Sequence, residues 1–553
     1  MQLSYENGLL YGLLLGNGRL NLAFNSEMNI RRAFFPIDCH HDMFLKIGIY
    51  EKGRKYLKWF AFRDSELRDF ILTNSNVELF VDALEPIIAF NVKHDRNIGI
   101  LWGARINGTI RNNSCFFEDG IFYFNKRGVC FGLKGDVVDY SCGYNLEEQI
   151  LEGYLDKQRF SMRDCMTAGV FSGSKFFMVA GESVNEVKKK MGLLPSYEEL
   201  KRRTISFWRE KTKHSGENNL MNMSKYILKI LQDPNGGVIA APEFDPDYRH
   251  CGGYGYCWPR DAAYVLKALI VLNLEEEAKR LLEFLAPLNP NGEFFQRYFL
   301  NGQQAPSWCE QIDQTGSFIW AVGEYWKKYG KLNEGIIRSV ERSGHFLEKM
   351  FKAPFETTDL WEERKGTMAY SCAAAYKGLT EGHNIMKAHG KLHPQWIEMA
   401  KNLRTSFFEA YWDPTEKRFA RSIDSHEEIK DSVADSSLIG LAVPFEIVEK
   451  NDPKMRGTIR FIEEKLELKG GIMRYEGDVY PYGNSAWNVC TAWLAWYYRE
   501  CGHMDKAMKY IEMVEKSATK HFLLPEQVND EHKPKWVLPL AWSHANYVIA
   551  KYG

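Results

Sequence analysis

The 553-residue sequence lacks the features that mark several classes of protein. Its 71 lysines and arginines nearly balance its 72 aspartates and glutamates, so no net charge attracts nucleic acid or an anionic membrane surface. No apolar run approaches the roughly 20 residues of a membrane-spanning helix. The eleven cysteines include no Cys-x-x-Cys pair, so neither a disulfide framework nor a zinc knuckle is indicated. These absences favour a cytoplasmic protein with a small, uncharged partner.

Short apolar runs rich in β-branched and aromatic residues fill the first third of the chain, up to about residue 177. Turn-forming pairs such as Asn17-Gly18 and Asp119-Gly120 interrupt these runs at short intervals. This pattern predicts an antiparallel β-sandwich. The most apolar run, Gly8–Gly16, has no basic region before it, so we expect a buried strand and not an export signal.

Between residues 184 and 217 the pattern becomes helical and heavily charged, as in Val187-Lys-Lys-Lys190. Such a segment is typical of a helical connector with a solvated face. We therefore predict a β-sandwich domain over residues 1–183, a helical linker over residues 184–217 and a helical domain over residues 218–553.

Twelve stretches with the 3.6-residue period of a helix occupy the rest of the chain, beginning near residues 219, 260, 276, 313, 334, 369, 393, 433, 454, 485, 504 and 540. The odd-numbered stretches carry charges on one face, as in Glu275–Glu283. The even-numbered stretches are small and apolar all round, as in Tyr370–Tyr376, and such helices must be surrounded by others. Alternating outer and inner helices pair into hairpins, which predicts an (α/α)6 barrel.

Aromatic, acidic and arginine residues are concentrated in loops that precede or open all but one of the inner helices. If the inner helices run parallel, these loops meet at one mouth of the barrel. We therefore expect a pocket lined by aromatic rings and carboxylates. The segments are Tyr254–Asp261, Trp308–Asp313, Asp359–Glu363, Arg474–Asp478, and Leu524–Gln527 with Leu540–His544.

Two carboxylates on facing walls of such a pocket suit glycoside hydrolysis. One must keep its proton to protonate the departing oxygen, and burial against aromatic rings raises the pKa of a carboxyl group. The other must stay ionised to activate water. Arg260 and Asp261 can hold the hydroxyls of one sugar ring, although such a pair at a helix start is often a cap and a salt bridge. The convergence of the loops favours the sugar site.

The motifs in these loops resemble those of glycoside hydrolase family 15, the glucoamylases, glucodextranases and microbial trehalases. The resemblance covers nearly the whole chain, and even Gly16-Asn-Gly-Arg19 is similar to the start of prokaryotic members. It implies an N-terminal β-supersandwich, a helical linker, an (α/α)6 catalytic barrel and an inverting mechanism. The similar strings are Tyr-Gly-Tyr-Cys-Trp-Pro-Arg-Asp (254–261), Asp-Leu-Trp-Glu-Glu (359–363), Arg-Tyr-x-x-Asp (474–478), Pro-Glu-Gln (525–527) and Leu-Ala-Trp-Ser-His (540–544).

By this resemblance Glu362 is the general acid and Glu526 is the general base. Glu363, the neighbour of the acid, is expected to orient the site or to bind a hydroxyl. The resemblance implies further substrate-binding residues, namely Arg260, Asp261 and Arg474, together with the aromatic residues Tyr254, Trp258, Trp308, Trp361 and Trp542.

Neither a catalytic metal ion nor a cofactor is expected, and whether a structural metal ion binds stays open. His40, His41 and His544 have no second set of ligands at a useful spacing. Hydrogen-bonded structural roles are therefore expected for these histidines.

The resemblance implies an exo-acting α-glucoside hydrolase that releases β-D-glucose from the non-reducing ends of malto-oligosaccharides, the commonest activity of the family. Trehalose and α-1,6-linked glucans are alternative substrates, because they present the same terminal glucose. An inverting glycoside phosphorylase and a non-catalytic carbohydrate-binding protein are alternatives of other classes. Glu526 argues against the phosphorylase, in which phosphate replaces the water and no base carboxylate is needed. We expect no nucleic-acid or membrane partner, and the oligomeric state stays open.

Overall fold

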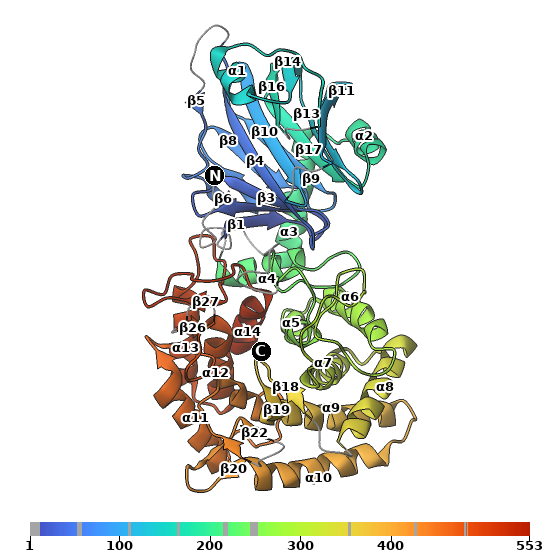
Figure 1. The fold of residues 1–553 in the computed structure, drawn as a ribbon, viewed down its shortest axis with the longest axis vertical. Coiled ribbons are helices and arrows are strands. Elements are labelled where there is room, and N and C mark those ends of the chain that lie inside the picture. Colours follow the sequence, from blue (N-terminus) through green and yellow to red (C-terminus); the bar gives the residue numbers. More distant parts are fainter. Residues whose placement is uncertain are drawn as a thin grey trace. The chain divides into compact units, whose positions relative to one another are not determined.

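The structure is a computed structural model that describes residues 11–51, 58–108, 112–162, 166–213, 219–243, 253–351, 356–424, 429–480, 483 and 485–553. The chain forms two compact units (Figure 1). The first comprises Met1–Asp233 and Lys520–Leu523, and the second comprises Pro234–Thr519 and Leu524–Gly553. The segment predicted as a linker, residues 184–217, is part of the first unit.

Two antiparallel β-sheets form the first unit, and their facing side chains share one apolar core. In that core the ring centroids of Trp102 and Phe124, one from each sheet, lie 4.4 Å apart. One sheet has the order β1 (Tyr11–Gly16), β2 (Asn21–Asn25), β3 (Ile30–Phe34), β4 (His40–Ile49), β10 (Ile98–Ile106), β16 (Met166–Phe171) and β14 (Val137–Cys142), with β5 (Lys58–Trp59) beside β4. The other has the order β15 (Phe160–Ser161), β11 (Ser114–Glu118), β12 (Ile121–Lys126), β13 (Val129–Lys134), β17 (Lys175–Gly181), β9 (Ile87–Val92), β8 (Val77–Val81), β7 (Ile71–Thr73) and β6 (Glu66–Arg68). The prediction of an antiparallel β-domain is confirmed, and the expected buried strand near the N-terminus is β1.

The described part of the first unit includes the helices α1 (Leu146–Glu152), α2 (Val184–Gly192), α3 (Tyr197–Thr212) and α4 (Leu220–Ile230). Ser183 and Ser196 cap α2 and α3, each accepting a hydrogen bond from the backbone N–H three residues on. Val187 and Met191 of α2 pack into an apolar cluster on the second sheet. The charged segment after the last strand is therefore held to the β-domain.

Asp82 anchors α3 through a buried ion pair. Its fully buried carboxylate accepts hydrogen bonds of 2.6 Å from both Nε and Nη2 of Arg203. The backbone N–H groups of Leu84 and Glu85 donate to the same carboxylate, at 3.1 and 2.8 Å. The cation on α3 is thus compensated by a charge that is itself fixed by backbone N–H groups of the loop between β8 and β9.

We expect Asp82→Ala to lower the free energy of unfolding by about 3 kcal/mol, because it leaves a half-buried guanidinium and two backbone donors without their acceptor. Urea-induced unfolding measures this loss. Lys188→Ala is the matched control, because its pair with Asp119 is exposed, with side-chain accessibilities of 51% and 59%, and it should cost less than about 1 kcal/mol. Equal losses in the two variants would contradict the anchoring role of Asp82.

A closed ring of six inner elements forms the second unit: α5 (Pro259–Val271), α7 (Asp313–Tyr329), α9 (Ala369–Ala388), η3 (Ser436–Leu441), α12 (Asn488–Glu500) and α14 (Ala541–Tyr552). Each contacts the next, and α14 contacts α5. Outside the ring, α6 (Glu275–Leu285), α8 (Glu334–Met350), α10 (Pro394–Tyr411), α11 (Pro453–Leu466) and α13 (Met504–Lys516) pack on the inner elements. The predicted arrangement of a barrel with all-round apolar inner helices is confirmed, whereas the first predicted outer helix, α4, is part of the first unit.

The eighth predicted helical stretch is only the short 3-10 helix η3. Pro444 follows it, and proline has no N–H to donate and disfavours the α-conformation in the residue before it. A Cβ atom at Gly440 would lie 2.7 Å from ring carbons of Tyr370, so this element passes unusually close to α9. These local constraints shorten the helix without opening the ring.

Short strands complete the second unit. The sheets are β18 (Thr357–Thr358), β19 (Lys365–Met368), β22 (Ser422–Ile423) and β23 (Lys430–Asp431); β20 (Trp412–Asp413) and β21 (Arg418–Phe419); and β24 (Glu467–Leu468), β25 (Gly471–Ile472), β26 (Ala486–Trp487) and β27 (Gln527–Val528). The 3-10 helix η2 (Ala286–Leu288) follows α6.

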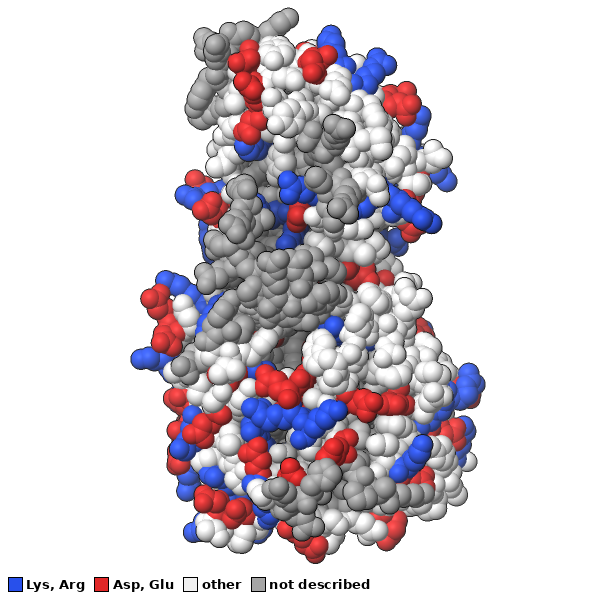
Figure 2. All heavy atoms as spheres, viewed as in Figure 1, with Lys and Arg blue, Asp and Glu red and all other residues white. Residues whose placement is uncertain are grey.

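Basic and acidic side chains are interspersed on the face shown in Figure 2, as the near-zero net charge leads one to expect. Within the described ranges, no helix has both the length and the apolar character that crossing a membrane requires.

Candidate active site

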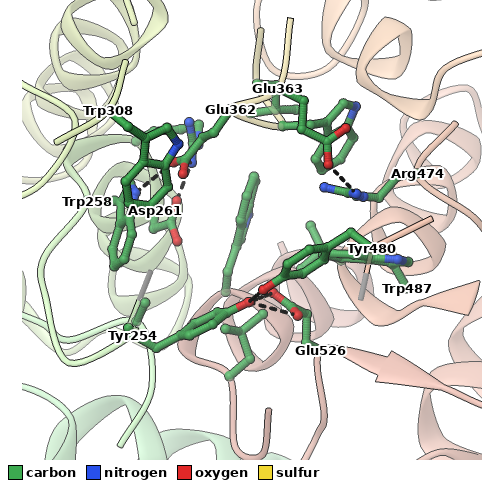
Figure 3. Close-up of a pocket in the computed structure, with 18 residues that line it drawn as sticks. Tyr254, Trp258, Asp261, Trp308, Glu362, Glu363, Arg474, Tyr480, Trp487 and Glu526 are labelled. Carbon is green, nitrogen blue, oxygen red and sulfur yellow. Dashed lines mark hydrogen bonds and ion pairs between the residues drawn. The ribbon is translucent and has the colours of Figure 1, made fainter. Parts of the chain in front are cut away.

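A cavity of about 280 Å³ lies where the inner helices begin (Figure 3). Its lining residues come from the segments that precede or open α5, α7, α9, α12 and α14, so these helix N-termini face one space. The volume is near the lower end of ligand pockets, about 300–1,000 Å³, and suits a short substrate end. All of the predicted site residues line this cavity: Tyr254, Trp258, Arg260, Asp261, Trp308, Trp361, Glu362, Glu363, Arg474, Glu526 and Trp542.

Arg260 is the central cation of one wall. Its guanidinium nitrogens lie 3.3 Å from Asp261, 3.6 Å from Asp313 and 3.5 Å from Glu362. Gln311 accepts a further hydrogen bond from Nη1 at 3.2 Å. Burial disfavours the charged form, but the surrounding carboxylates outweigh it and raise the pKa of Arg260 above its usual range. The arginine is therefore held charged and in fixed orientation.

Several buried polar atoms in this wall have no well-aligned hydrogen bond to the described protein atoms. They are Nε of Arg260 and Oδ1 of Asp261, which lie 3.3 Å apart as an ion pair, and both carboxylate oxygens of Asp313. Burial raises the pKa values of Asp261 and Asp313 to about 6, against the opposing effect of Arg260. Unsatisfied buried polar atoms are costly, so a polar ligand that bonds to them gains free energy. Because Asp261 lines the cavity, the wall is suited to ligand hydroxyls.

Glu362 lies in a tight turn between β18 and β19. Asp359 organises this turn, since its carbonyl accepts from the N–H of Glu362 at 3.1 Å and its carboxylate accepts from the N–H of Glu363 at 2.8 Å. Glu362 has a left-handed backbone with φ of 67°, which costs free energy in any residue with a Cβ atom. Trp258 Nε1 donates a hydrogen bond of 2.8 Å to Oε1. The turn thus directs the Glu362 carboxylate toward the arginine wall (Figure 3).

Glu526 lies on the other side of the cavity, opposite Glu362 in Figure 3. The hydroxyl of Tyr254 is 3.0 and 3.1 Å from its two carboxylate oxygens, and the hydroxyl of Tyr480 is 2.9 Å from that of Tyr254. Burial raises the pKa of Glu526 to about 8, while the Tyr254 hydrogen bond and the charge of Arg474 act in the opposite direction. The raised pKa therefore falls on the carboxyl group that the resemblance assigns as the base.

Glu363 and Glu362 are neighbours in sequence but face different partners. Glu363 Oε1 accepts a hydrogen bond of 2.8 Å from Nη2 of Arg474. Arg474 also forms a bidentate pair with Asp478, at 2.8 and 2.6 Å, and its guanidinium lies 4.6 Å from the ring centroid of Trp487. Glu363 is thus tied into a second arginine cluster.

A stack of aromatic rings around Arg297 forms the rim beside Glu362. The buried guanidinium of Arg297 lies 4.5 Å from the ring centroids of both Tyr256 and Trp308, and 5.3 Å from that of Trp258. Its Nε donates to the carbonyl of Pro306 at 2.7 Å. Trp308 is 51% exposed, so its free ring face is available at the cavity rim.

The other two predicted tryptophans are fixed by polar and charged neighbours. Nε1 of Trp361 donates to Asp435 at 2.9 Å, and the ring of Trp542 lies 5.5 Å from the guanidinium carbon of Arg260. Both rings are buried except where they meet the cavity.

The histidines considered as metal ligands are buried. Nε2 of His41 is 2.7 Å from the carbonyl oxygen of Phe35, and Nε2 of His544 accepts from the N–H of Leu524 at 3.0 Å. Burial lowers the pKa of His40 and of His544 to about 3 and that of His41 to about 4, so all three are neutral near pH 7.

The arrangement of two carboxylates across a cavity with an arginine wall agrees with a comparison of the sequence with known families. The model of Glycosyl hydrolases family 15 matches residues 215–304 and 306–522, more than half of the chain. The chain belongs to glycosyl hydrolases family 15.

Individual relatives agree with this membership. An uncharacterized glycosyl hydrolase of Methanocaldococcus jannaschii is 32% identical over 345 residues, 59% of this chain but only 54% of that protein, so the chain spans about half of its length. Trehalase 2 of Sulfolobus acidocaldarius is 26% identical over 478 residues, 78% of each protein. A crystal structure of a bacterial glucoamylase complexed with acarbose covers 98% of this chain and 93% of its own, with a TM-score of 0.78 at 19% identity, which shows a shared fold.

Tyr480 and Trp487 also line the cavity of this family 15 protein, although no sequence motif singled them out. The backbone N–H of Tyr480 donates to Asp478 at 2.9 Å, so the Arg474–Asp478 motif positions it. Trp487 directly precedes α12. Their closeness in sequence to that motif and to a helix start is the signal that could have identified them.

In this family 15 protein we expect Arg297→Leu to lower the free energy of unfolding by about 1–3 kcal/mol, because it leaves the carbonyls of Pro306 and Gly253 without their donor. It should also make Trp308 and Trp258 more accessible to acrylamide, because the cation that holds their rings is lost. Thermal unfolding and fluorescence quenching measure the two effects. Arg297→Lys keeps the charge but not the planar fork and should be intermediate; unchanged stability in both variants would contradict the role of Arg297.

Proposed function

We propose that this family 15 protein is an inverting, exo-acting α-glucoside hydrolase that releases β-D-glucose from the non-reducing ends of malto-oligosaccharides. The observation that carries the proposal is the position of Glu362 and Glu526 on opposite sides of a cavity whose wall holds the buried Arg260 cluster (Figure 3).

The Arg260 wall is the proposed site of the terminal glucose. Arg260 and Asp261 both line the cavity, and their N–H groups and carboxylate oxygens match the donors and acceptors of sugar hydroxyls. Charge-assisted hydrogen bonds from a rigid arginine fix one ring relative to Glu362, which lies 3.5 Å from the same guanidinium. A small cavity closed by this wall favours chain ends over chain middles, which supports exo action.

Glu362 is the proposed general acid. It lies beside Arg260, and therefore beside the first sugar ring, and Trp258 Nε1 fixes one of its oxygens. In this position its free oxygen can protonate the glycosidic oxygen as the bond between sugar and leaving group breaks.

Glu526 is the proposed general base. A water molecule between Glu526 and the anomeric carbon would lose a proton to this carboxylate as its oxygen attacks. The hydrogen bond from Tyr254 orients the carboxylate and favours its ionised form. With a pKa near 8, the ionised carboxylate of Glu526 accepts a proton more readily than an ordinary glutamate does. The ionised form becomes the major form only as the pH rises toward this pKa.

The exchange of roles is the main competing assignment. The pKa of Glu526 by itself suits an acid, because the protonated form persists at neutral pH. The motif resemblance and the closeness of Glu362 to the arginine wall favour the assignment proposed here. A substrate whose leaving group needs no proton distinguishes the two assignments.

Trehalose is the second candidate substrate, because Trehalase 2 of Sulfolobus acidocaldarius aligns with 78% of the chain. Trehalose and α-1,6-linked glucans present the same terminal glucose to Arg260, and the difference lies in the second sugar beyond Glu362. The exposed ring of Trp308 at the rim is placed to contact that second sugar.

The other classes of function account less well for the carboxylates. In a phosphorylase Glu526 would have no catalytic role, and a binding protein would need neither carboxylate. A cytoplasmic location, suggested by composition alone, is part of the proposal.

We expect maltoheptaose and maltose to release glucose faster than isomaltose and trehalose, with β-glucose as the first anomer. Proton NMR during the first minutes, before mutarotation, reads both the rate and the anomer. Inverting enzymes hold their carboxyl groups roughly 6.5–9.5 Å apart, which leaves room for a water molecule between the base and the sugar. This water attacks the face opposite the departing oxygen, so an α-glucoside releases β-glucose. Initial α-glucose would overturn the inverting mechanism, faster turnover of trehalose would make it the substrate, and dependence on added phosphate would indicate a phosphorylase.

We expect Glu362→Gln to lower kcat on maltose by about 10²–10⁴-fold but to spare α-glucosyl fluoride, because fluoride departs without a proton. Glu526→Gln should lose activity on both substrates by a similar factor, because the water loses its base. Steady-state kinetics on the two substrates measure this pattern, and Glu363→Gln controls for the loss of one nearby charge. The reverse pattern would show that the two roles are exchanged.

The pH profile of kcat/KM should fall on its acidic side with the pKa of Glu526, near 8, because the base must be ionised. Tyr254→Phe removes a hydrogen bond to the carboxylate, so this pKa should rise and the acidic limb should move to higher pH. At about pH 6 the variant should be about tenfold less active than the native protein, with a smaller loss at higher pH. A uniform loss at every pH would contradict this role of Tyr254.

A further inference from the structure

A cluster of potential metal ligands lies on the outer helices of the second unit. Glu341 and His345 are on α8 and His393 directly precedes α10. One ligand atom from each residue lies within 4.8 Å of the others. None of the three lines the cavity described above, so the proposed hydrolysis does not use them.

We propose that Glu341, His345 and His393 bind a zinc ion, or a similar divalent transition metal, that joins α8 to the start of α10. Residues four apart lie on one face of a helix, so Glu341 and His345 can reach the same ion. Two imidazole nitrogens and one carboxylate oxygen are ligands that zinc prefers, whereas magnesium prefers oxygen ligands alone. The three residues lie outside the cavity described above, so the ion would be structural and not catalytic.

The separation of the ligand atoms supports this assignment. Oε1 of Glu341 lies 3.2 Å from Nε2 of His393. Two ligands of a tetrahedral zinc ion, each at roughly 2.0–2.1 Å, lie about 3.3 Å apart. The side chain of His345 is 51% exposed, so a small rotation can bring it into the same shell, and water can take the fourth position.

Neighbouring side chains orient the two imidazoles. Glu348 Oε2 lies 3.4 Å from Nδ1 of His345 and accepts a hydrogen bond of 3.0 Å from Nε1 of Trp396. A carboxylate bonded to Nδ1–H leaves Nε2 of His345 as the metal ligand, as is usual for metal-binding histidines. The ring of His393 stacks on Trp396 with centroids 4.3 Å apart, which fixes its plane.

The local charge is compatible with a cation. Nζ of Lys391 lies 2.5 Å from Oε2 of Glu341, which leaves Oε1 for the metal. Glu341 and Glu348 carry two negative charges against the single positive charge of Lys391, so a divalent ion finds a net negative cluster.

Isothermal titration calorimetry tests the site. The protein is the 553-residue chain, prepared without a polyhistidine tag and dialysed against a chelator. We expect saturable binding of zinc chloride that is absent with magnesium chloride and lost in the His345→Ala/His393→Ala double variant. Glu348→Gln should weaken binding about 10–100-fold, because it removes only the partner of the ligand. His503→Ala, which removes an exposed histidine outside the cluster, should bind as the native protein does.

Thermal unfolding gives a second readout. Zinc should raise the unfolding temperature of the native protein and of His503→Ala but not that of the double variant, because a ligand that binds only the folded state stabilises it. Glucose release should be the same for all variants. Zinc binding that survives in the double variant, or no saturable binding in the micromolar range, would overturn the proposal.

Discussion

The burial of one positive charge, that of Arg260, is the constraint on which the active-site end of the barrel depends. An isolated buried charge costs several kcal/mol, and here Asp261, Asp313 and Glu362 compensate it. These carboxylates come from the starts of α5 and α7 and from the turn before α9. The charge is therefore compensated only when three segments of the ring have come together. Packing of α5, the start of α7 and the turn before α9 is thus coupled to formation of the arginine wall.

Much of this arrangement could be predicted from sequence, because it follows from local patterns. Helices that are apolar all round must be inside, and polar loops at their starts must then share one end of the barrel. This reasoning placed residues as distant as Tyr254 and Trp542 in one cavity.

Other features depend on contacts that no local pattern records. The charge pattern of segment 184–217 is the same for a free linker and for a helix packed on a domain. The segment is held to the β-domain by the contact of Arg203 with Asp82, which lies more than a hundred residues earlier in the sequence. The close approach of Gly440 to Tyr370 likewise joins segments that lie far apart in the sequence.

The raised pKa of Glu526 could not be predicted either. The motif places tryptophans beside Glu362, so the sequence directs attention to burial at that residue. In the folded chain Glu362 lies beside a cation and an indole N–H, and burial raises the pKa of Glu526 to about 8. Desolvation depends on how several segments close over a side chain, and this information is absent from the nearest residues in sequence.

The left-handed backbone of Glu362 bears on how this protein can evolve. A residue with a Cβ atom is less stable in that conformation than glycine, by about 1 kcal/mol or more. Glycine at this position would relieve the strain, but it would also leave Trp258 Nε1 without its acceptor and Arg260 with one carboxylate fewer. The contacts of the carboxylate therefore offset the strain of the backbone. A change at this position can keep the fold stable only if an acceptor still faces Trp258 and Arg260.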